Sequence, residues 1–414
     1  YRGNPDAILV GAFDRGKLLD EAIAKAKDSG RLVLWYIPRI TEEQLRGRQM
    51  YRGPVLDIYM RQVLFSDPDV VGIINASFVP LRMVYDEAMA KRFGLGPLDF
   101  IEPAVLVLDG EGKTVLALDQ IRTFHAGWFA HLLKRVRKTA QATVDTGDGS
   151  PDALAMAGEW DAALKALEQE EASATRDYRM AGLARRQRDF DQASAYVASA
   201  RLALDSDPDG ESGSAAGSRR GRRRNPAKDT LRTAIGMEEA LLWINTRRTP
   251  LGLAAMYEQL TEASLQLQNA WRRERWGGVA PRRAEAGYML GLCHWLLGQQ
   301  LEAAKWFQLT ADNFPDSPWG RKATANITLG PDQRPLGAVF CGFESYGLIP
   351  ADIADKQAAQ LGSELPLPVD TRTPPLGNAE AADDPMLKRM RESVVVSVSM
   401  ANLLELQRSD GGFT

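Results

Sequence analysis

The residues able to perform covalent or metal chemistry are few in this chain and are scattered along it. Its two cysteines, Cys293 and Cys341, lack metal-ligand spacing and are too few for a disulfide framework. Only three histidines are present, which argues against a structural zinc site. The stretches GLGPLD (94–99) and GDGSPD (147–152) have the glycines of phosphate loops without the lysine. The sequence therefore predicts no cofactor, no metal and no catalytic residues, and favours binding over catalysis.

The composition is that of a soluble globular protein with room for two or three domains. The chain has 414 residues, of which 44% are hydrophobic and 25% are charged. A net charge of -3 argues against nucleic acid as a partner of the whole chain. No apolar stretch approaches the roughly 18 to 20 residues of a membrane span. The first residue, Tyr1, and the last residues, DGGFT, suggest a fragment of a longer polypeptide.

The N-terminal third alternates helical and strand patterns. Residues 17–30 have apolar residues at helical spacing and end in glycine, whereas 31–38 form a run of β-branched and aromatic residues. Residues 71–84 indicate a helix end followed by a second strand. Residues 103–118 indicate two strands joined by a glycine turn, and 128–138 a closing helix. This pattern predicts a small α/β sheet covered by helices on both faces.

The stretches VLFSDPDVVGIINASFVPLRM and FIEPAVLVLDGEGKTV resemble the thioredoxin-like family, in particular its thiol:disulfide-interchange branch. The resemblance covers about residues 10–140. In that branch a helix opens with Cys-x-x-Cys, and a methionine and a phenylalanine follow at fixed spacing. When Phe65 is aligned with that phenylalanine, Met60 falls on the methionine. The resemblance implies a thioredoxin-like domain over residues 1–145.

The same alignment places Pro54 and Asp57 on the two redox cysteines, and Pro103 on the family's cis-proline beside its peptide groove. Thiol–disulfide exchange needs one thiolate to attack and a second thiol to resolve the mixed disulfide, and neither position carries sulfur. Proline and aspartate both suit a first helical turn, so the helix is expected without its redox chemistry. Binding of an extended peptide or protein partner beside Pro103 is the activity that we expect to remain.

From about residue 150 the chain becomes rich in alanine with helical periodicity, and a short pattern recurs. The segments AGEWDAALKAL, QRDFDQASAYV and LGQQLEAAKWF centre on Ala163, Ala193 and Ala303. They resemble the tetratricopeptide repeat, a helix–turn–helix unit, over residues 150–328, and the best copy spans 284–317. In that copy the family positions are matched by Leu290, Gly291, Ala303, Phe307 and Pro315, while His294 and Thr310 depart from the pattern. The three alanines are expected at close helix crossings.

The remaining segments have biased compositions. Residues 205–229 contain RRGRRR and almost no apolar residue, which predicts a disordered basic insertion, more typical of a solvated loop than of a nucleic-acid site. Residues 331–385 are a proline-rich connector. Within 386–414, the segment Gln407–Phe413 resembles the repeat motif of squalene-cyclase and prenyltransferase-like toroids, so a helical toroid domain is expected to begin there. The segment DNFPDSPWGRKA resembles repeat ends of bacterial envelope proteins and favours a periplasmic or otherwise extracytoplasmic location, with the cytoplasm as the alternative.

Two interpretations of function remain open from the sequence. In the first, the protein is a non-catalytic interaction scaffold in which a redox-inactive thioredoxin-like domain precedes tetratricopeptide repeats. In the second, it is the accessory N-terminal part of a larger enzyme, or a thioredoxin-related redox or chaperone protein, whose active site lies outside this chain. The features of the chain itself favour the first, with a protein or peptide as partner.

Overall fold

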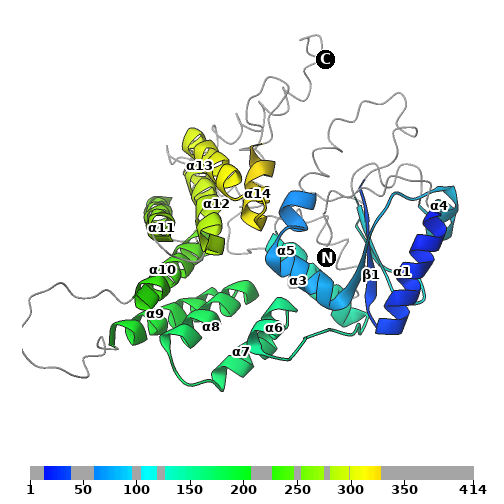
Figure 1. Cartoon of the computed structure of the whole chain (residues 1–414), viewed down its shortest axis with the longest axis horizontal. Helices are drawn as coiled ribbons and strands as arrows, with labels where there is room; N and C mark the ends of the chain where they lie inside the picture. The colour runs from blue at the N-terminus through cyan, green and yellow to red at the C-terminus, as the bar shows by residue number, and fades with distance from the viewer. Residues whose placement is uncertain are drawn as a thin grey trace, which may run out of the picture. The chain divides into compact units, whose positions relative to one another are not determined.

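The computed structural model describes residues 14–38, 60–95, 104–118, 126–206, 226–246, 253–274, 280–297 and 299–327. These residues divide into two compact units (Figure 1). The first unit includes the described residues up to Glu159, and the second extends from Trp160 to Ala323. The first unit contains a small mixed sheet and the second is helical, so the predicted order of an α/β part followed by a helical part is confirmed at this coarse level.

A four-stranded sheet forms the centre of the first unit. The elements in chain order are α1 (Arg15–Ser29), β1 (Leu32–Ile37), the π-helical turn η1 (Met60–Leu64), α3 (Pro68–Ser77), β2 (Phe78–Arg82), α4 (Glu87–Phe93), β3 (Ala104–Leu108), β4 (Thr114–Leu118), α5 (Ala126–Thr139) and α6 (Pro151–Met156). The strand order is β2-β1-β3-β4. β1 is parallel to β2 and antiparallel to β3, and β4 is antiparallel to β3. A connection between two parallel strands needs a crossover, and η1 and α3 lie within it.

Local sequence signals account for the ends of α1. The Asp14 carboxylate accepts a hydrogen bond from the Lys17 backbone N–H, which satisfies one of the amides that a helix start leaves unpaired. At the other end Gly30 adopts a left-handed conformation with φ 65°, which costs glycine little because it has no Cβ. The predicted end of this helix at the glycine is therefore confirmed.

Helices cover both faces of the sheet, as the sequence predicted (Figure 1). On one face, Trp35 of β1 and Leu106 of β3 pack with buried residues of α1 and α4, such as Leu19 and Met89. On the other face, the ring of Tyr36 contacts that of Phe65, which follows η1, with centroids 5.1 Å apart. Phe65 in turn contacts Phe129 of α5 at 5.9 Å. β1 is buried along its whole length because both faces of the sheet are covered.

The helix α6 belongs to the first unit, although the sequence placed residues from 150 onward with the helical repeats. A Cβ added to Gly72 of α3 would lie 2.0 Å from the carbonyl oxygen of Met156, so the two segments meet at backbone distance. Arg137, buried on α5, donates hydrogen bonds to the Ser77 hydroxyl (3.0 Å) and the Ala157 carbonyl (2.6 Å). Its guanidinium also pairs with the carboxylate of Glu159. These contacts hold residues 156–159 against α3 and α5.

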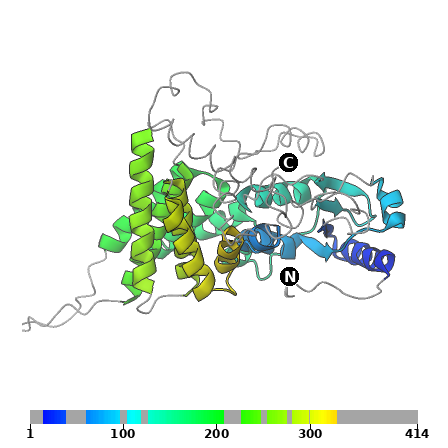
Figure 2. The ribbon, with the colours of Figure 1, turned by 90° about the horizontal axis from the view of Figure 1, so that it is seen from above.

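The second unit is a succession of helices. They are α7 (Trp160–Glu168), α8 (Ala174–Gln187), α9 (Phe190–Ser206), α10 (Pro226–Thr246), α11 (Leu253–Glu274), α12 (Ala280–Leu296) and α13 (Gln300–Asn313). The last helix, α14 (Pro318–Asn326), belongs to this unit as far as Ala323. From α7 to α13 each helix packs against the next one along the chain. Figure 2, seen at right angles to Figure 1, shows the green to yellow helices running side by side. No strand occurs in the described part of residues 150–327, which confirms the predicted helical character.

The alanines that define the recurring pattern are fully buried. Ala163, Ala193 and Ala303 each have no exposed surface. The predicted insertion at 205–229 is too long at both ends, because α9 includes residues 205 and 206 and α10 begins at Pro226. Proline suits the first turn of a helix, where its missing N–H leaves no bond unmade.

Several predictions from sequence concern residues outside the described ranges. These are the positions aligned with the redox cysteines and with the cis-proline, namely Pro54, Asp57 and Pro103. The residues between α9 and α10, the connector at 331–385 and the segment at 386–414 lie outside these ranges too. They remain predictions.

The close approach of α3 and α6 makes Gly72 sensitive to substitution. We expect Gly72→Ala to lower the free energy of unfolding by about 1–3 kcal/mol, because a methyl group there overlaps the Met156 carbonyl and forces the helices apart. Urea unfolding followed by circular dichroism measures this change.

The matched control is Gly182→Ala in α8. A Cβ at Gly182 has its nearest neighbour, a Glu238 carboxylate oxygen, at an ordinary 3.7 Å. Replacing a mid-helix glycine by alanine then raises stability by roughly 0.5–1 kcal/mol. A neutral or stabilising effect of Gly72→Ala would contradict the packing of α6 against α3.

Candidate functional site

Cys293 is part of the core of the second unit. It lies on α12 with no exposed surface, and its thiol donates a hydrogen bond to the Leu260 carbonyl of α11 at 2.9 Å. A cysteine buried in this way is out of reach of thiols in solution. Cys293 therefore serves the packing of α12 against α11, whereas Cys341 lies outside the described residues.

The strongest electrostatic feature of the second unit is a buried carboxylate between two arginines, which we call the charge cluster (Arg185, Glu238 and Arg282). Arg185 of α8 donates to Glu238 of α10 from Nε at 2.7 Å and from Nη2 at 3.3 Å. Arg282 of α12 donates from Nη2 to the same carboxylate at 3.0 Å and from Nη1 to the Ala234 carbonyl at 3.2 Å. One carboxylate therefore joins three helices that are not consecutive in the chain.

The pKa values around the cluster follow from burial opposed by charge. Burial by itself raises the pKa of Glu238, but Arg185 and Arg282 outweigh it and hold the value at about 2. Burial raises the pKa of the Tyr178 phenol to about 12, and the Arg282 guanidinium lies 5.1 Å from the centre of its ring. Burial also raises the pKa of Glu285, which lies one turn along α12 from Arg282. The two arginines thus keep Glu238 ionised although it is buried.

On its other side α10 lines a cavity of about 190 Å³. Arg232 and Gly236 line this cavity, and each is two residues from Ala234, which faces the charge cluster. Residues two positions apart in an α-helix point in directions that differ by roughly 160° around its axis. The charge cluster and the cavity therefore lie on opposite sides of α10. The lining residues are Arg201, Leu204 and Asp205 of α9; Arg232, Thr233, Ile235 and Gly236 of α10; and Gln266, Asn269 and Ala270 of α11.

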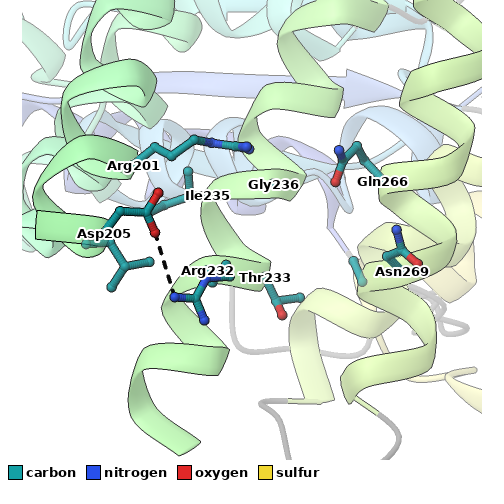
Figure 3. Close-up of a pocket in the computed structure, with 10 residues that line it drawn as sticks. Arg201, Asp205, Arg232, Thr233, Ile235, Gly236, Gln266 and Asn269 are labelled. Atoms are coloured by element: carbon teal, nitrogen blue, oxygen red, sulfur yellow. Dashed lines mark ion pairs between the residues drawn. The ribbon is translucent and has the colours of Figure 1, made fainter. Parts of the chain in front are cut away.

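Polar side chains of α9, α10 and α11 line the cavity, and Figure 3 shows Arg201 and Asp205 facing Gln266 and Asn269 across α10. The Arg232 guanidinium lies 3.8 Å from the Asp205 carboxylate, and both side chains are about half exposed. Leu204, Ile235 and Ala270 are buried and supply apolar surface. The cavity is smaller than the roughly 300–1,000 Å³ of sites that enclose a whole small molecule. It suits a side chain with adjoining backbone.

None of these lining residues was singled out from the sequence. Their one-letter pattern is that of ordinary polar helix surface, and only the packing of α9 and α11 on α10 brings them together. No group of three or more His, Cys, Asp or Glu suited to a metal ion occurs among the described residues. The helices that the structure describes also include none with the length and hydrophobicity needed to cross a membrane. What the cavity offers is hydrogen bonding and charge.

Comparison of the chain with protein-family models, curated proteins and solved structures yielded no match.

The charge cluster predicts a specific dependence of stability on pH. Because the folded state lowers the pKa of Glu238 from 4.5 to about 2, its stabilising effect is complete above pH 4.5 and is lost as the pH falls toward 2. The pH-dependent part is about 3 kcal/mol, at roughly 1.4 kcal/mol per pKa unit. We therefore expect wild type and Glu238→Gln to differ most near neutral pH and to converge in acid, as measured by urea unfolding across this range.

Glu239→Gln is the control, since its carboxylate pairs with Arg201 in a partly exposed position. The Glu239→Gln substitution is expected to lower the free energy of unfolding by less than about 1 kcal/mol. Glu285 keeps its carboxyl in both wild type and Glu238→Gln, so much of its own contribution cancels in the difference. If the free energies of unfolding of wild type and Glu238→Gln differ as much in acid as at neutral pH, Glu238 is not held ionised by the arginines.

Proposed function

We propose that this protein is a non-catalytic interaction scaffold, in which a redox-inactive thioredoxin-like domain precedes an array of tetratricopeptide-like helical hairpins that binds a protein partner. The α/β unit supports the first half of the proposal. Its strand order β2-β1-β3-β4, its parallel β1–β2 pair and its antiparallel β3 and β4, with helices on both faces, are the features expected of a thioredoxin-like core. The sequence contains no cysteine before Cys293.

The helical unit supports the second half. Helices α8 and α9, α10 and α11, and α12 and α13 pack as consecutive pairs. Within the last pair, a Cβ at Gly291 would lie 2.4 Å from the Phe307 ring, so the glycine permits the close approach that the repeat pattern implies. Buried alanines at Ala193 and Ala303 serve the same close packing.

The observation that carries the proposal is where this unit exposes its large apolar side chains. Among its described residues these are Leu202 on α9, Leu265 on α11, and Leu301 and Leu309 on α13. All four lie on the second helix of a pair, and Leu301 is 81% exposed. Single exposed leucines are common on protein surfaces, but their restriction to equivalent helices favours a partner-facing surface there. We call the outer surface of α9, α11 and α13 the odd-helix face.

Photo-crosslinking tests the use of this face. A photoreactive amino acid placed at Leu202 or Leu265 of the full chain is expected to yield crosslinks to one partner protein in extracts of the native host. Thr175, exposed on α8, is the control position. Crosslinking at Thr175 with none at Leu202 or Leu265 would contradict the assignment of the binding surface.

The absence of thiol chemistry is tested separately. We expect the full chain to catalyse no insulin reduction above background, because disulfide exchange requires an attacking and a resolving thiol and Cys293 is buried. A Cys293→Ser/Cys341→Ser variant is expected to behave identically. Turnover by the wild type that disappears in this variant would show that the chain is an oxidoreductase.

A further inference from the structure

Arg283 on α12 is held by aromatic rings and not by a carboxylate. Its guanidinium lies 4.5 Å from the centre of the Trp271 ring of α11 and 5.7 Å from that of Phe314, which follows α13. It forms no ion pair or hydrogen bond with any residue that the structure describes. The preceding residue, Arg282, instead shares the Glu238 carboxylate with a second arginine. The charge of Arg283 is therefore left without a paired carboxylate in the described part of the unit.

The rings that hold Arg283 are fixed by the packing of three helices. Trp271 is 8% exposed and meets Trp306 of α13 edge-on, with ring centroids 5.3 Å apart. Phe314 meets Trp271 in the same way at 5.9 Å. A Cβ added to Gly287 of α12 would lie 2.6 Å from the Trp271 ring, so α12 passes this ring at close range. A guanidinium stacked on such rings is pre-oriented, and a ligand does not have to order it.

The guanidinium of Arg283 offers its outer end to a ligand. Its Nε atom is buried and has no hydrogen-bond partner, whereas its two Nη atoms are not buried in this way and the residue as a whole is half-buried. The N–H groups of the two Nη atoms form a fixed fork that matches the two oxygens of a carboxylate. A guanidinium with this setting selects a planar anionic group that approaches end-on.

The surrounding charges favour a singly charged ligand group. Two aspartates lie within two residues of Phe314, and both are outside ion-pair distance of Arg283. Asp312 accepts a hydrogen bond from Gln308 at 2.7 Å, and Asp316 is exposed. A phosphate close to two negative charges needs more than one guanidinium to offset its own, whereas a carboxylate needs one. The arrangement therefore favours a carboxylate over a phosphate.

An apolar surface on α13 adjoins Arg283. Trp306, whose ring contacts that of Trp271, is half-buried, and Leu309 is 40% exposed. Trp306 and Leu309 are three residues apart and share one side of α13. Since Leu309 belongs to the odd-helix face, the contacts from Leu309 through the two tryptophans place Arg283 at the border of that face.

We propose that Arg283 anchors a protein partner by pairing end-on with one Asp or Glu carboxylate, while an apolar side chain beside that carboxylate contacts Trp306 and Leu309. The proposal rests on the scaffold function and assigns its partner a chemical class, an acidic residue next to an apolar one. It extends the odd-helix face onto α12. A purely structural Arg283 would join α11 to α12 without any effect on what the protein binds, and the test separates these two roles.

The test uses the full chain and an array of short peptides of varied sequence, each with a central Glu-Leu pair. Matched sets carry Gln-Leu or phosphoserine-Leu instead, and the Glu-Leu set is expected to bind most strongly. For the best peptide, measured by isothermal titration calorimetry, Arg283→Gln is expected to raise Kd about tenfold and to abolish the preference for glutamate over glutamine. Arg283→Lys keeps the charge without the planar fork, and is expected to raise Kd about threefold with the preference retained.

The matched control is Arg272→Gln, which removes an exposed arginine from the residue next to Trp271. It changes the net charge of the chain by the same amount as Arg283→Gln, and is expected to change Kd less than about twofold. Circular dichroism establishes that the three variants are folded. Because the stacking on Trp271 is lost in Arg283→Gln, the glutamate-to-glutamine comparison within each variant isolates the contact with the peptide carboxylate.

The outcomes separate this inference from the scaffold function. Equal Kd values for wild type and Arg283→Gln, or equal losses of affinity in Arg272→Gln and Arg283→Gln, would overturn the assignment of Arg283. Stronger binding of the phosphoserine set by the wild type would overturn the carboxylate as the recognised group. Crosslinking at Leu202 or Leu265 without glutamate-dependent peptide binding would refute this inference and leave the scaffold function intact, whereas absence of both would contradict the scaffold function as well.

Discussion

The requirement that a buried carboxylate be paired organises the helical unit. Glu238 is almost fully removed from water, and an ion in that position is tolerated only when opposite charges and hydrogen bonds surround it. Arg185 and Arg282 supply them from helices on either side of α10 in the chain. The demand for both partners fixes α8, α10 and α12 in one register and one rotation. Apolar packing alone fixes the register and rotation of helices less strictly, because apolar side chains of similar size can exchange contacts at small cost in free energy.

The fixed rotation of α10 determines which of its residues lie on the side opposite the charge cluster. The short or flexible residues there, Thr233 and Gly236 among them, leave space that α9 and α11 do not fill. A cavity supported in this way differs from one formed by loops, because its walls are anchored by buried packing on α10. Residues at the open side can then vary without disturbing the closed side, because the two sides involve different residues of the same helix.

Sequence reasoning identified the features that depend on neighbouring residues. The run LVLWYI indicated a strand covered on both faces, Gly30 indicated a helix end, and the spaced alanines indicated paired helices. It could not identify the charge cluster, because Glu238 lies 53 residues from Arg185 and 44 from Arg282. The same limit explains the misplaced boundary near residue 150, where the contact between Gly72 and Met156 joins helices far apart in the chain. Lining residues such as Asn269 carry no local signal, since a polar residue on a helix is ordinarily a solvated one.

The two-sided use of α10 has a consequence for how the chain can change length. Inserting or deleting one residue between Arg232 and Glu238 would rotate one side relative to the other by about 100° and shift it by about 1.5 Å along the axis. The carboxylate and the cavity wall would then no longer face their respective neighbours at the same time. Insertions or deletions before Arg232 or after Glu238 do not change the angle around the helix axis between the cavity side and the charge-cluster side of α10. The seven residues from Arg232 to Glu238 therefore act as a fixed spacer, in which substitutions can be accepted one at a time but the number of residues cannot alter.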